Sequence, residues 1–318
     1  MAPASPLNPT VSAVDAARDA IAHTRQHLFP IRPERWLLLG FLALLDQCGR
    51  GGGGGTSGWR THATEWPWRN GWPGRVEDIP DALRTLSDWL SAHAAVVALA
   101  VLAGLILLAG LMAVVLWINA RGTFVYLDDV ASGRCDVVRP WREHAASAWS
   151  YLGWRFGLGL AAVFVVLFVG GLVVAAAMAF VHGRLEGPTG VLAAAGLVPV
   201  VLLLLFALPL LTLANLALRD FVAPLQLTTG LPCGQAARVL EGLVMQQPGA
   251  FLLYLLLKLG LVVGSGVVIV LGGCLTCCLG FLPLVMQTVF QPLFFVERAL
   301  PLFLLRQMGH DLPRRLGG

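Results

Sequence analysis

Long apolar runs separated by short polar segments dominate the chain. A bilayer core of about 30 Å requires about 20 helical residues, and four runs reach that length. Three of them contain no charged residue, and the fourth contains only Lys258. A shorter run at 279–296 carries Gln287 and Gln291 and predicts a further span. The four long runs are residues 94–118, 156–181, 191–218 and 250–273.

The first apolar run, at residues 36–45, is too short to cross a bilayer alone. Asp46 follows it directly, and a full span over 36–55 requires the glycine run at 51–55. A half-span that enters the membrane and returns is the alternative. We favour the full span, because the distribution of arginines described below requires the chain to cross here.

The chain is therefore expected to be an all-α integral membrane protein, a helical bundle of about six transmembrane spans. Apolar positions at helical spacing predict amphipathic helices in the membrane interface at 14–28, 140–152 and 234–245. In the first of these, Val14, Ala17, Ile21 and Leu28 share a face. The expected divisions are an N-terminal tail with its helix (1–35), the weak first span (36–55), an outer loop rich in Trp and Gly (56–93), the membrane bundle (94–296) and a cytoplasmic tail (297–318).

Composition excludes a soluble protein. Hydrophobic residues make up 57% of the chain and charged residues 13%, whereas soluble domains carry about 25% charged residues. The N-terminus has neither the basic region nor the apolar region of a cleavable signal peptide. We expect the first span to direct the chain to the membrane.

Arginines lie unevenly between the two sets of connecting segments. With six spans, 15 arginines fall on the side that holds both termini and 6 on the other. Cytoplasmic segments carry the Lys and Arg excess. We therefore expect a multi-pass protein of the cytoplasmic (inner) membrane with both termini in the cytoplasm and the loop at 56–93 outside.

Two stretches of the chain read alike. Each contains a span, a Phe-Val pair, a small residue followed by Gly, a Cys, an amphipathic segment and the next span. The pattern predicts a parallel two-helix repeat with a pseudo-twofold axis along the membrane normal; chance similarity between apolar sequences is the alternative. The matching positions are Phe124-Val125 with Phe221-Val222, Ser132-Gly133 with Thr229-Gly230, Cys135 with Cys233, and Tyr151-Leu152 with Phe251-Leu252.

Several short motifs together carry a resemblance to a known group. They are Leu28-Phe29-Pro30, 36–41, the glycine run 51–55, 124–128 with Ser132-Gly133, 139–141 and 296–302. The chain resembles an uncharacterised group of prokaryotic polytopic membrane proteins, which is distantly similar to the membrane region of glycerophosphodiester phosphodiesterases. The resemblance implies the topology. It does not imply phosphodiesterase activity, because that chemistry belongs to a separate soluble barrel domain for which this chain has no room.

Four polar residues inside the spans form the candidate intramembrane site: Lys258, Gln287, Gln291 and Asn215. Ionisable groups inside a bilayer are costly and often functional. We expect Lys258 to face the bundle interior within reach of Gln287 or Gln291; the alternatives are a side chain that snorkels to the interface and glutamines that bond neighbouring helices. Asp46 is a similar case on the weaker first span.

Other candidate motifs have simpler interpretations. Asp128-Asp129 lacks a second acidic motif, and a solvated helix face is expected. Cys274-x-x-Cys277-Cys278 lacks a fourth ligand for zinc, and small residues packing a hairpin are preferred to a disulfide. The tryptophans of the outer loop are expected to anchor it in the interface, with binding of a sugar, a lipid headgroup or a protein as the alternative. These tryptophans are Trp59, Trp66, Trp68 and Trp72.

No motif indicates an enzyme, a cofactor or a metal site, and the dispersed arginines argue against nucleic-acid binding. The expected function is a non-enzymatic scaffold or accessory component, with the lipid bilayer and other membrane proteins as partners. The alternative is a carrier or channel for a lipid-like or other small substrate. It is motivated by helix-breaking residues inside spans: Pro199, Pro209, Gly264, Gly266, Pro283 and Pro292.

Overall fold

The computed structural model describes residues 11–47, 89, 92–181, 188–275 and 282–317, and every regular element among them is a helix. The elements are α1 (Ala13–Leu28), α2 (Pro33–Gln47), α4 (Ala94–Ser132), α5 (Val138–Glu143), α6 (Ala145–Val181), α7 (Pro188–Ala217), the π-helix η4 (Leu218–Val222), α8 (Ala223–Thr229), α9 (Cys233–Gln246), α10 (Pro248–Leu275), α11 (Pro283–Val289), α12 (Gln291–Gln307) and α13 (Leu312–Gly317).

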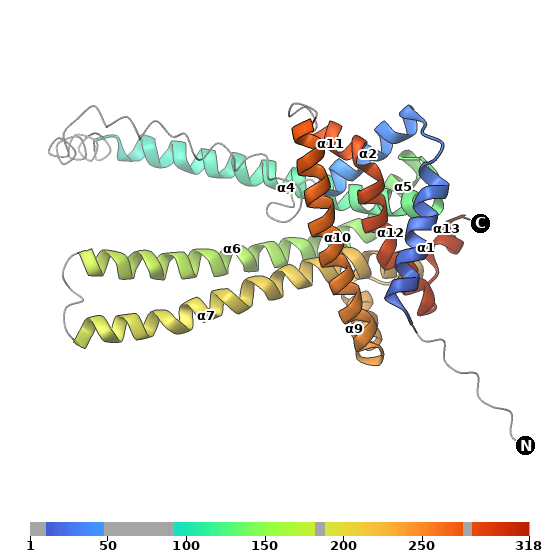
Figure 1. Cartoon of the computed structure of the whole chain (residues 1–318). Helices are drawn as coiled ribbons and strands as arrows, with labels where there is room; N and C mark the ends of the chain where they lie inside the picture. The colour runs from blue at the N-terminus through green and yellow to red at the C-terminus, as the bar shows by residue number, and fades with distance from the viewer. Residues whose placement is uncertain (1–10, 48–88, 90–91, 182–187, 276–281, 318) are drawn as a thin grey trace, which may run out of the picture.

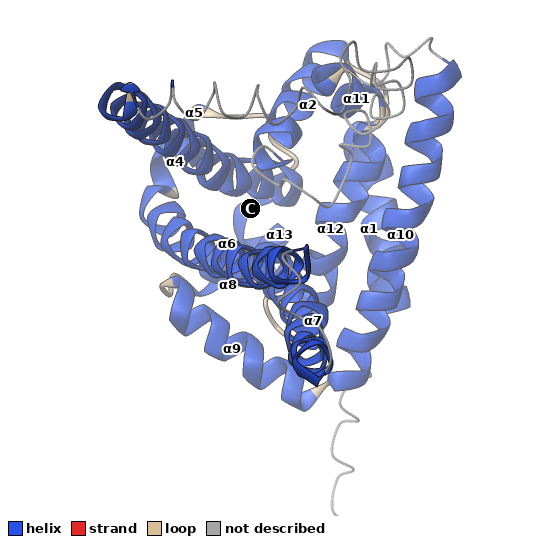
Figure 2. Ribbon diagram, turned by 90° about the vertical axis from the view of Figure 1, so that its left-hand side faces the viewer, coloured by secondary structure: helices blue, strands red, loops and turns tan. Residues whose placement is uncertain are grey.

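Three long helices, α4, α6 and α7, extend to one side from a compact end built mostly of shorter helices (Figure 1). Figure 2 looks nearly along these three helices, and α10 runs across that direction. The helices long and apolar enough to cross a membrane are Ala94–Ser132, Ala145–Ala175, Leu202–Thr229 and Pro248–Leu275. For the described residues, the prediction of an all-helical chain with helices of membrane-spanning length and composition is confirmed.

The expected run at 279–296 does not form one helix. It is divided at Phe290, between α11 and α12. Pro292 follows in the first turn of α12, and a proline ring inside a helix would clash with the carbonyl four residues earlier. Helix α12 continues past 296 to Gln307 and buries Phe295, Ala299 and Leu302.

The short helices α2 and α11 pack on each other. An added Cβ on Gly40 would lie 2.4 Å from Thr288 Oγ1, so only glycine permits this approach. With 15 residues, α2 is shorter than the roughly 20 that a perpendicular span requires. Residues 48–88, which would complete the expected first span, lie outside the described residues.

The amphipathic helices lie close to where they were predicted. Helices α1 and α9 match 14–28 and 234–245, while 140–152 is divided at His144 between α5 and α6. On α1, Val14 and Ile21 of the predicted apolar face are 49% and 58% exposed, whereas Leu28 is buried. The buried face consists of small residues, Ala13, Ala16, Ala20 and Thr24, with Leu28 at the end, because α1 lies close against α12.

Two turns at the compact end have the same geometry. Helix α4 ends at Gly133 and α8 ends at Gly230, with φ of 68° and 74°. Each glycine donates its N–H to the carbonyl four residues earlier, Asp129 O and Gln226 O. The left-handed conformation is costly for residues with a Cβ, which explains the glycines.

Aromatic pairs join the helices on either side of these turns. The rings of Phe124 and Tyr151 lie 5.6 Å apart, and those of Phe221 and Phe251 lie 5.1 Å apart. These are the positions that the sequence comparison matched between the two halves.

Candidate functional site: a buried ionic cluster

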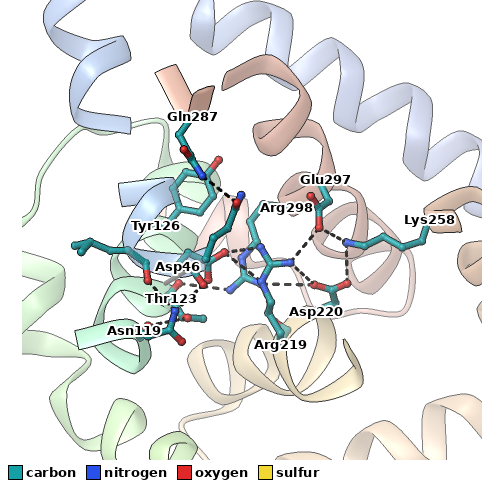
Figure 3. Close-up of polar contacts among 12 residues, drawn as sticks. Asp46, Asn119, Thr123, Tyr126, Arg219, Asp220, Lys258, Gln287, Glu297 and Arg298 are labelled. Carbon is teal, nitrogen blue, oxygen red and sulfur yellow. Dashed lines mark hydrogen bonds and ion pairs between the residues drawn. The ribbon is translucent and has the colours of Figure 1, made fainter. Parts of the chain in front are cut away.

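Six charged side chains meet inside the compact end (Figure 3). We call them the ionic cluster: Asp46 of α2, Arg219 and Asp220 of η4, Lys258 of α10, and Glu297 and Arg298 of α12. Glu297 has the most exposed side chain of the six, at 14%. The cluster therefore joins four helical elements that are distant in sequence.

The π-helix η4 places two consecutive cluster residues inside. All five residues of η4 are buried, because other helices surround this part of the chain on every side. Arg219 and Asp220 are therefore both inside, at 6% and 0% exposure. Single π-turns inside α-helices occur frequently at functional sites.

Arg219 bridges three carboxylates. Its Nε donates to Asp46 Oδ2 at 3.1 Å, and its Nη2 contacts the same oxygen. Its Nη1 lies 3.1 Å from Glu297 Oε1 and 3.5 Å from Asp220 Oδ1. The guanidinium thereby links α2 to α12.

Lys258 joins the same network from α10. Its Nζ lies 2.9 Å from Asp220 Oδ2 and 3.0 Å from Glu297 Oε1. Tyr254, one turn earlier on α10, donates its hydroxyl to Asp220 Oδ2 at 2.7 Å.

Arg298 is fully buried beside this network. Its Nη1 donates to the Arg219 carbonyl at 2.8 Å and lies 3.7 Å from Asp220 Oδ1. Its Nη2 donates to the Thr123 carbonyl of α4 at 3.4 Å. The cluster thus extends to the backbone of a fifth helix.

Neutral polar groups complete the site. Asn119 of α4 donates its Nδ2 to the carbonyls of Leu45 and Asp46, each at 2.7 Å. These carbonyls belong to the last turn of α2, where intrahelical donors are missing. Gln287 donates to Gln47 Oε1 at 3.1 Å, and Gln291 donates to Tyr126 Oη at 3.2 Å.

The charges of the cluster balance. Three cations face three carboxylates, and every carboxylate lies within 4 Å of at least one cation. A buried charge without a partner costs several kcal/mol, whereas a paired one is tolerated. The geometry therefore holds charged groups inside the protein without a net charge.

Three of the four predicted site residues lie in this region. Lys258 is 3% exposed and points inward, but acidic residues are its partners in place of the glutamines. Gln287 and Gln291 are buried and bond α2 and α4. Asn215 is not part of the site: its Nδ2 bonds the Leu211 carbonyl of its own helix at 3.3 Å.

Four of the six cluster residues were missed by the sequence reasoning. Arg219, Asp220, Glu297 and Arg298 were assigned to polar segments at the ends of spans. Each pair directly follows an apolar run, at 191–218 or 279–296, and contains an acid next to a base. That repeated acid-base pair is the signal that was available.

The prediction of a solvated face for Asp128-Asp129 is wrong. Both residues are buried, at 0% and 1% exposure, because α5 packs beside the end of α4. Asp128 lies 2.6 Å from Arg139 Nη2 and 2.8 Å from His144 Nε2. Asp129 Oδ1 accepts the N–H of Asp136.

The cysteine motif is only partly described. Cys274 is exposed and carries a free thiol, while Cys277 and Cys278 lie outside the described residues, as does the tryptophan-rich outer loop. Among the side chains that the structure describes, no three His, Cys, Asp or Glu residues are placed to hold a metal ion.

Comparison with known proteins gives one match. No curated protein and no solved structure matches the chain. A family described as a family of unknown function (DUF7544) matches residues 11–307, which is nearly the whole sequence. The chain therefore belongs to this family of unknown function, DUF7544.

Proposed function

We propose that this protein is a non-enzymatic scaffold or accessory component of the cytoplasmic membrane. In this proposal the ionic cluster is a clasp, meaning that its ion pairs hold α2, η4, α10 and α12 in one arrangement. The observation that carries the proposal is the balanced pairing of six buried charges from α2, η4, α10 and α12. Each of these groups is held in place by an oppositely charged partner. They are well suited to hold helices in one arrangement.

We also propose six membrane crossings, with both termini in the cytoplasm. The excess of arginines, 15 against 6, supports this orientation. Helices α2 and α11 pack on each other, which supports the proposal that these two short helices belong to the first and last of the six crossings. The two left-handed glycine turns and the two aromatic pairs at matching positions support a parallel repeat.

A carrier is the second candidate, and a different observation favours it. Polar side chains lie beside a broken helix, α11 and α12, and beside the π-turn η4. Carriers use such breaks to form a site that opens to each side of the membrane in turn. A clasp remains closed, so access to the cluster distinguishes the two functions.

The test uses single-cysteine variants of the full chain, in which the six native cysteines are replaced by Ala or Ser. Gln291→Cys reports on the buried polar region beside the cluster, Gly318→Cys on the C-terminus and Gly71→Cys on the outer loop. Right-side-out and inverted membrane vesicles are treated with a membrane-impermeant maleimide. Denatured protein serves as the labelling control for each variant.

The scaffold proposal predicts no labelling of Gln291→Cys from either side, with full labelling after denaturation. Gly318→Cys is expected to react only in inverted vesicles and Gly71→Cys only in right-side-out vesicles. Labelling of Gln291→Cys from both sides would support the carrier in place of the scaffold. Labelling of Gly318→Cys and Gly71→Cys from the same side would contradict the six-span topology.

A further inference from the structure

A buried arginine at the start of the α6 apolar stretch has no acidic partner in the part of the chain that the structure describes. Arg155 is 9% exposed, and its one hydrogen bond runs from Nη1 to Tyr151 Oη at 3.4 Å. None of the described carboxylates pairs with it, in contrast to each cation of the ionic cluster. A largely buried cation without a counter-charge is unfavourable, so an anion beside Arg155 would stabilise it.

A second arginine, on α4, also lacks an acidic partner among the described residues. The Arg121 guanidinium carbon is 5.7 Å from the ring centres of both Trp117 and Trp141. Its Nη1 donates to the Trp141 carbonyl at 2.6 Å, while its buried Nε has no hydrogen-bond partner. The two indoles and the carbonyl fix the guanidinium and leave donors unused.

The two arginines lie at the same level. Helices α4 and α6 run antiparallel (Figure 1), and the contact between Phe124 and Tyr151 sets their register. Arg121 precedes Phe124 by three residues, a distance of about 4.5 Å along the helix. Arg155 follows Tyr151 by four residues, about 6 Å in the same direction. Both therefore stand where the charge-free stretches of their helices meet the compact end.

Tryptophans mark this level as a membrane interface. Trp149 and Trp154 are 59% and 50% exposed on α6, and Trp117 and Trp141 frame Arg121. Tryptophan concentrates at the depth of the lipid headgroups, because its ring is apolar with one polar edge. The headgroup phosphates lie at that depth as well.

We propose that Arg121 and Arg155 bind the phosphate of a phospholipid headgroup. Guanidinium groups bind phosphate oxygens with paired charge-assisted hydrogen bonds. A phosphate supplies the negative charge that Arg155 lacks and an acceptor for the unused donors of Arg121. Soluble phosphate has the same chemistry, so the experiment must separate the two sources.

The test measures the thermal unfolding midpoint of the purified full chain in detergent micelles against increasing ligand. The ligands are phosphatidylglycerol, inorganic phosphate and diacylglycerol, which lacks the phosphate. The variants are R121Q/R155Q and, as a charge-preserving check on folding, R121K/R155K. R238Q is the matched control, since Arg238 is an exposed arginine of α9 without an ion pair to any described residue.

Phosphatidylglycerol is expected to raise the midpoint of the wild type, and diacylglycerol is not. In R121Q/R155Q the apparent Kd for the lipid is expected to rise at least about tenfold, which corresponds to about 1.4 kcal/mol. The apparent Kd of R121K/R155K is expected to lie between those of the wild type and R121Q/R155Q, because lysine binds phosphate without the bidentate fork. The Kd of R238Q is expected to match that of the wild type.

Stabilisation by inorganic phosphate equal to that by the lipid would support the same site with a soluble anion as its occupant. An unchanged Kd in R121Q/R155Q, or an equal loss in R238Q, would overturn the proposal. If R121Q/R155Q does not fold, an R121K/R155K protein that binds as tightly as the wild type would also overturn it.

Discussion

Two histidines of α1 are partly buried between α4 and α12. The rings of His23 and His27 lie 4.1 Å apart, and His23 Nε2 is 2.7 Å from the Val130 carbonyl. Burial lowers the pKa of His23, and it lowers the pKa of His27 to about 4. The cations Arg306 and Arg35 act in the same direction by repelling a protonated ring.

Acid is therefore expected to weaken the packing of α1. The pKa of His27 is lower in the folded protein than its usual value of 6.5, so its contribution to stability is complete above about pH 6.5 and is lost as the pH falls towards 4. The unfolding midpoint of the wild type is expected to fall between pH 7 and pH 4.5. His27→Gln is expected to reduce this dependence. An equal dependence in the variant would assign it to other groups.

At the scale of elements, the sequence predicts the apolar helices well because their signal is local. Length and hydrophobicity identify the helices that contain 94–118, 156–181, 191–218 and 250–273. Three features were not predictable in this way. The alanine face of α1 depends on how closely α12 approaches, the division at Phe290 depends on Pro292, and the π-turn η4 has no local sequence signature.

The two glycine turns provide a matched comparison at this scale. Both glycines have positive φ, so Gly230→Ala is expected to cost about 1–2 kcal/mol through the left-handed conformation alone. An added Cβ at Gly230 meets no atom within 4 Å, whereas at Gly133 it would lie 2.4 Å from the His27 ring. Gly133→Ala is therefore expected to be the more destabilising of the two.

Denaturant titration of the two variants measures this difference. Gly133→Ala/His27→Ala removes the ring and is expected to bring the cost of the Gly133 substitution close to that at Gly230. Equal costs for the two single variants would contradict the close packing of α1 on the α4 turn.

At the scale of the whole molecule, the ionic cluster depends on contacts between distant segments. Asp46 and Arg219 are separated by 173 residues, and Gln47 and Gln287 by 240. The sequence indicated that Lys258, Gln287 and Gln291 lie inside, because polar groups in apolar runs avoid lipid. It did not identify their partners, since pairing depends on which helix ends meet in three dimensions.

The central claim is that these buried charges act as one clasp. If so, removing one charge leaves the buried cluster with a net charge, and the cost is expected to be up to about 3–5 kcal/mol. Removing both members of a pair restores neutrality. The pair Asp220 and Lys258 suits this test, because their side chains are only 1% and 4% exposed and lie 2.9 Å apart.

A surface ion pair provides the control. Arg306 and Asp311 lie 3.3 Å apart, and the Arg306 side chain is 51% exposed. Exposed pairs of this kind contribute about 0–1 kcal/mol. A cycle with Arg306→Gln and Asp311→Asn is therefore expected to show little coupling.

The most direct measurement is the double-mutant cycle of Asp220→Asn and Lys258→Met, followed as the free energy of unfolding in detergent micelles. Asparagine retains an acceptor for the Tyr254 hydroxyl, so the cycle isolates the charge. We expect the double variant to be more stable than the sum of the two single losses predicts, by about 1–3 kcal/mol. Additive losses, or single losses no larger than those of the Arg306 and Asp311 variants, would contradict the clasp.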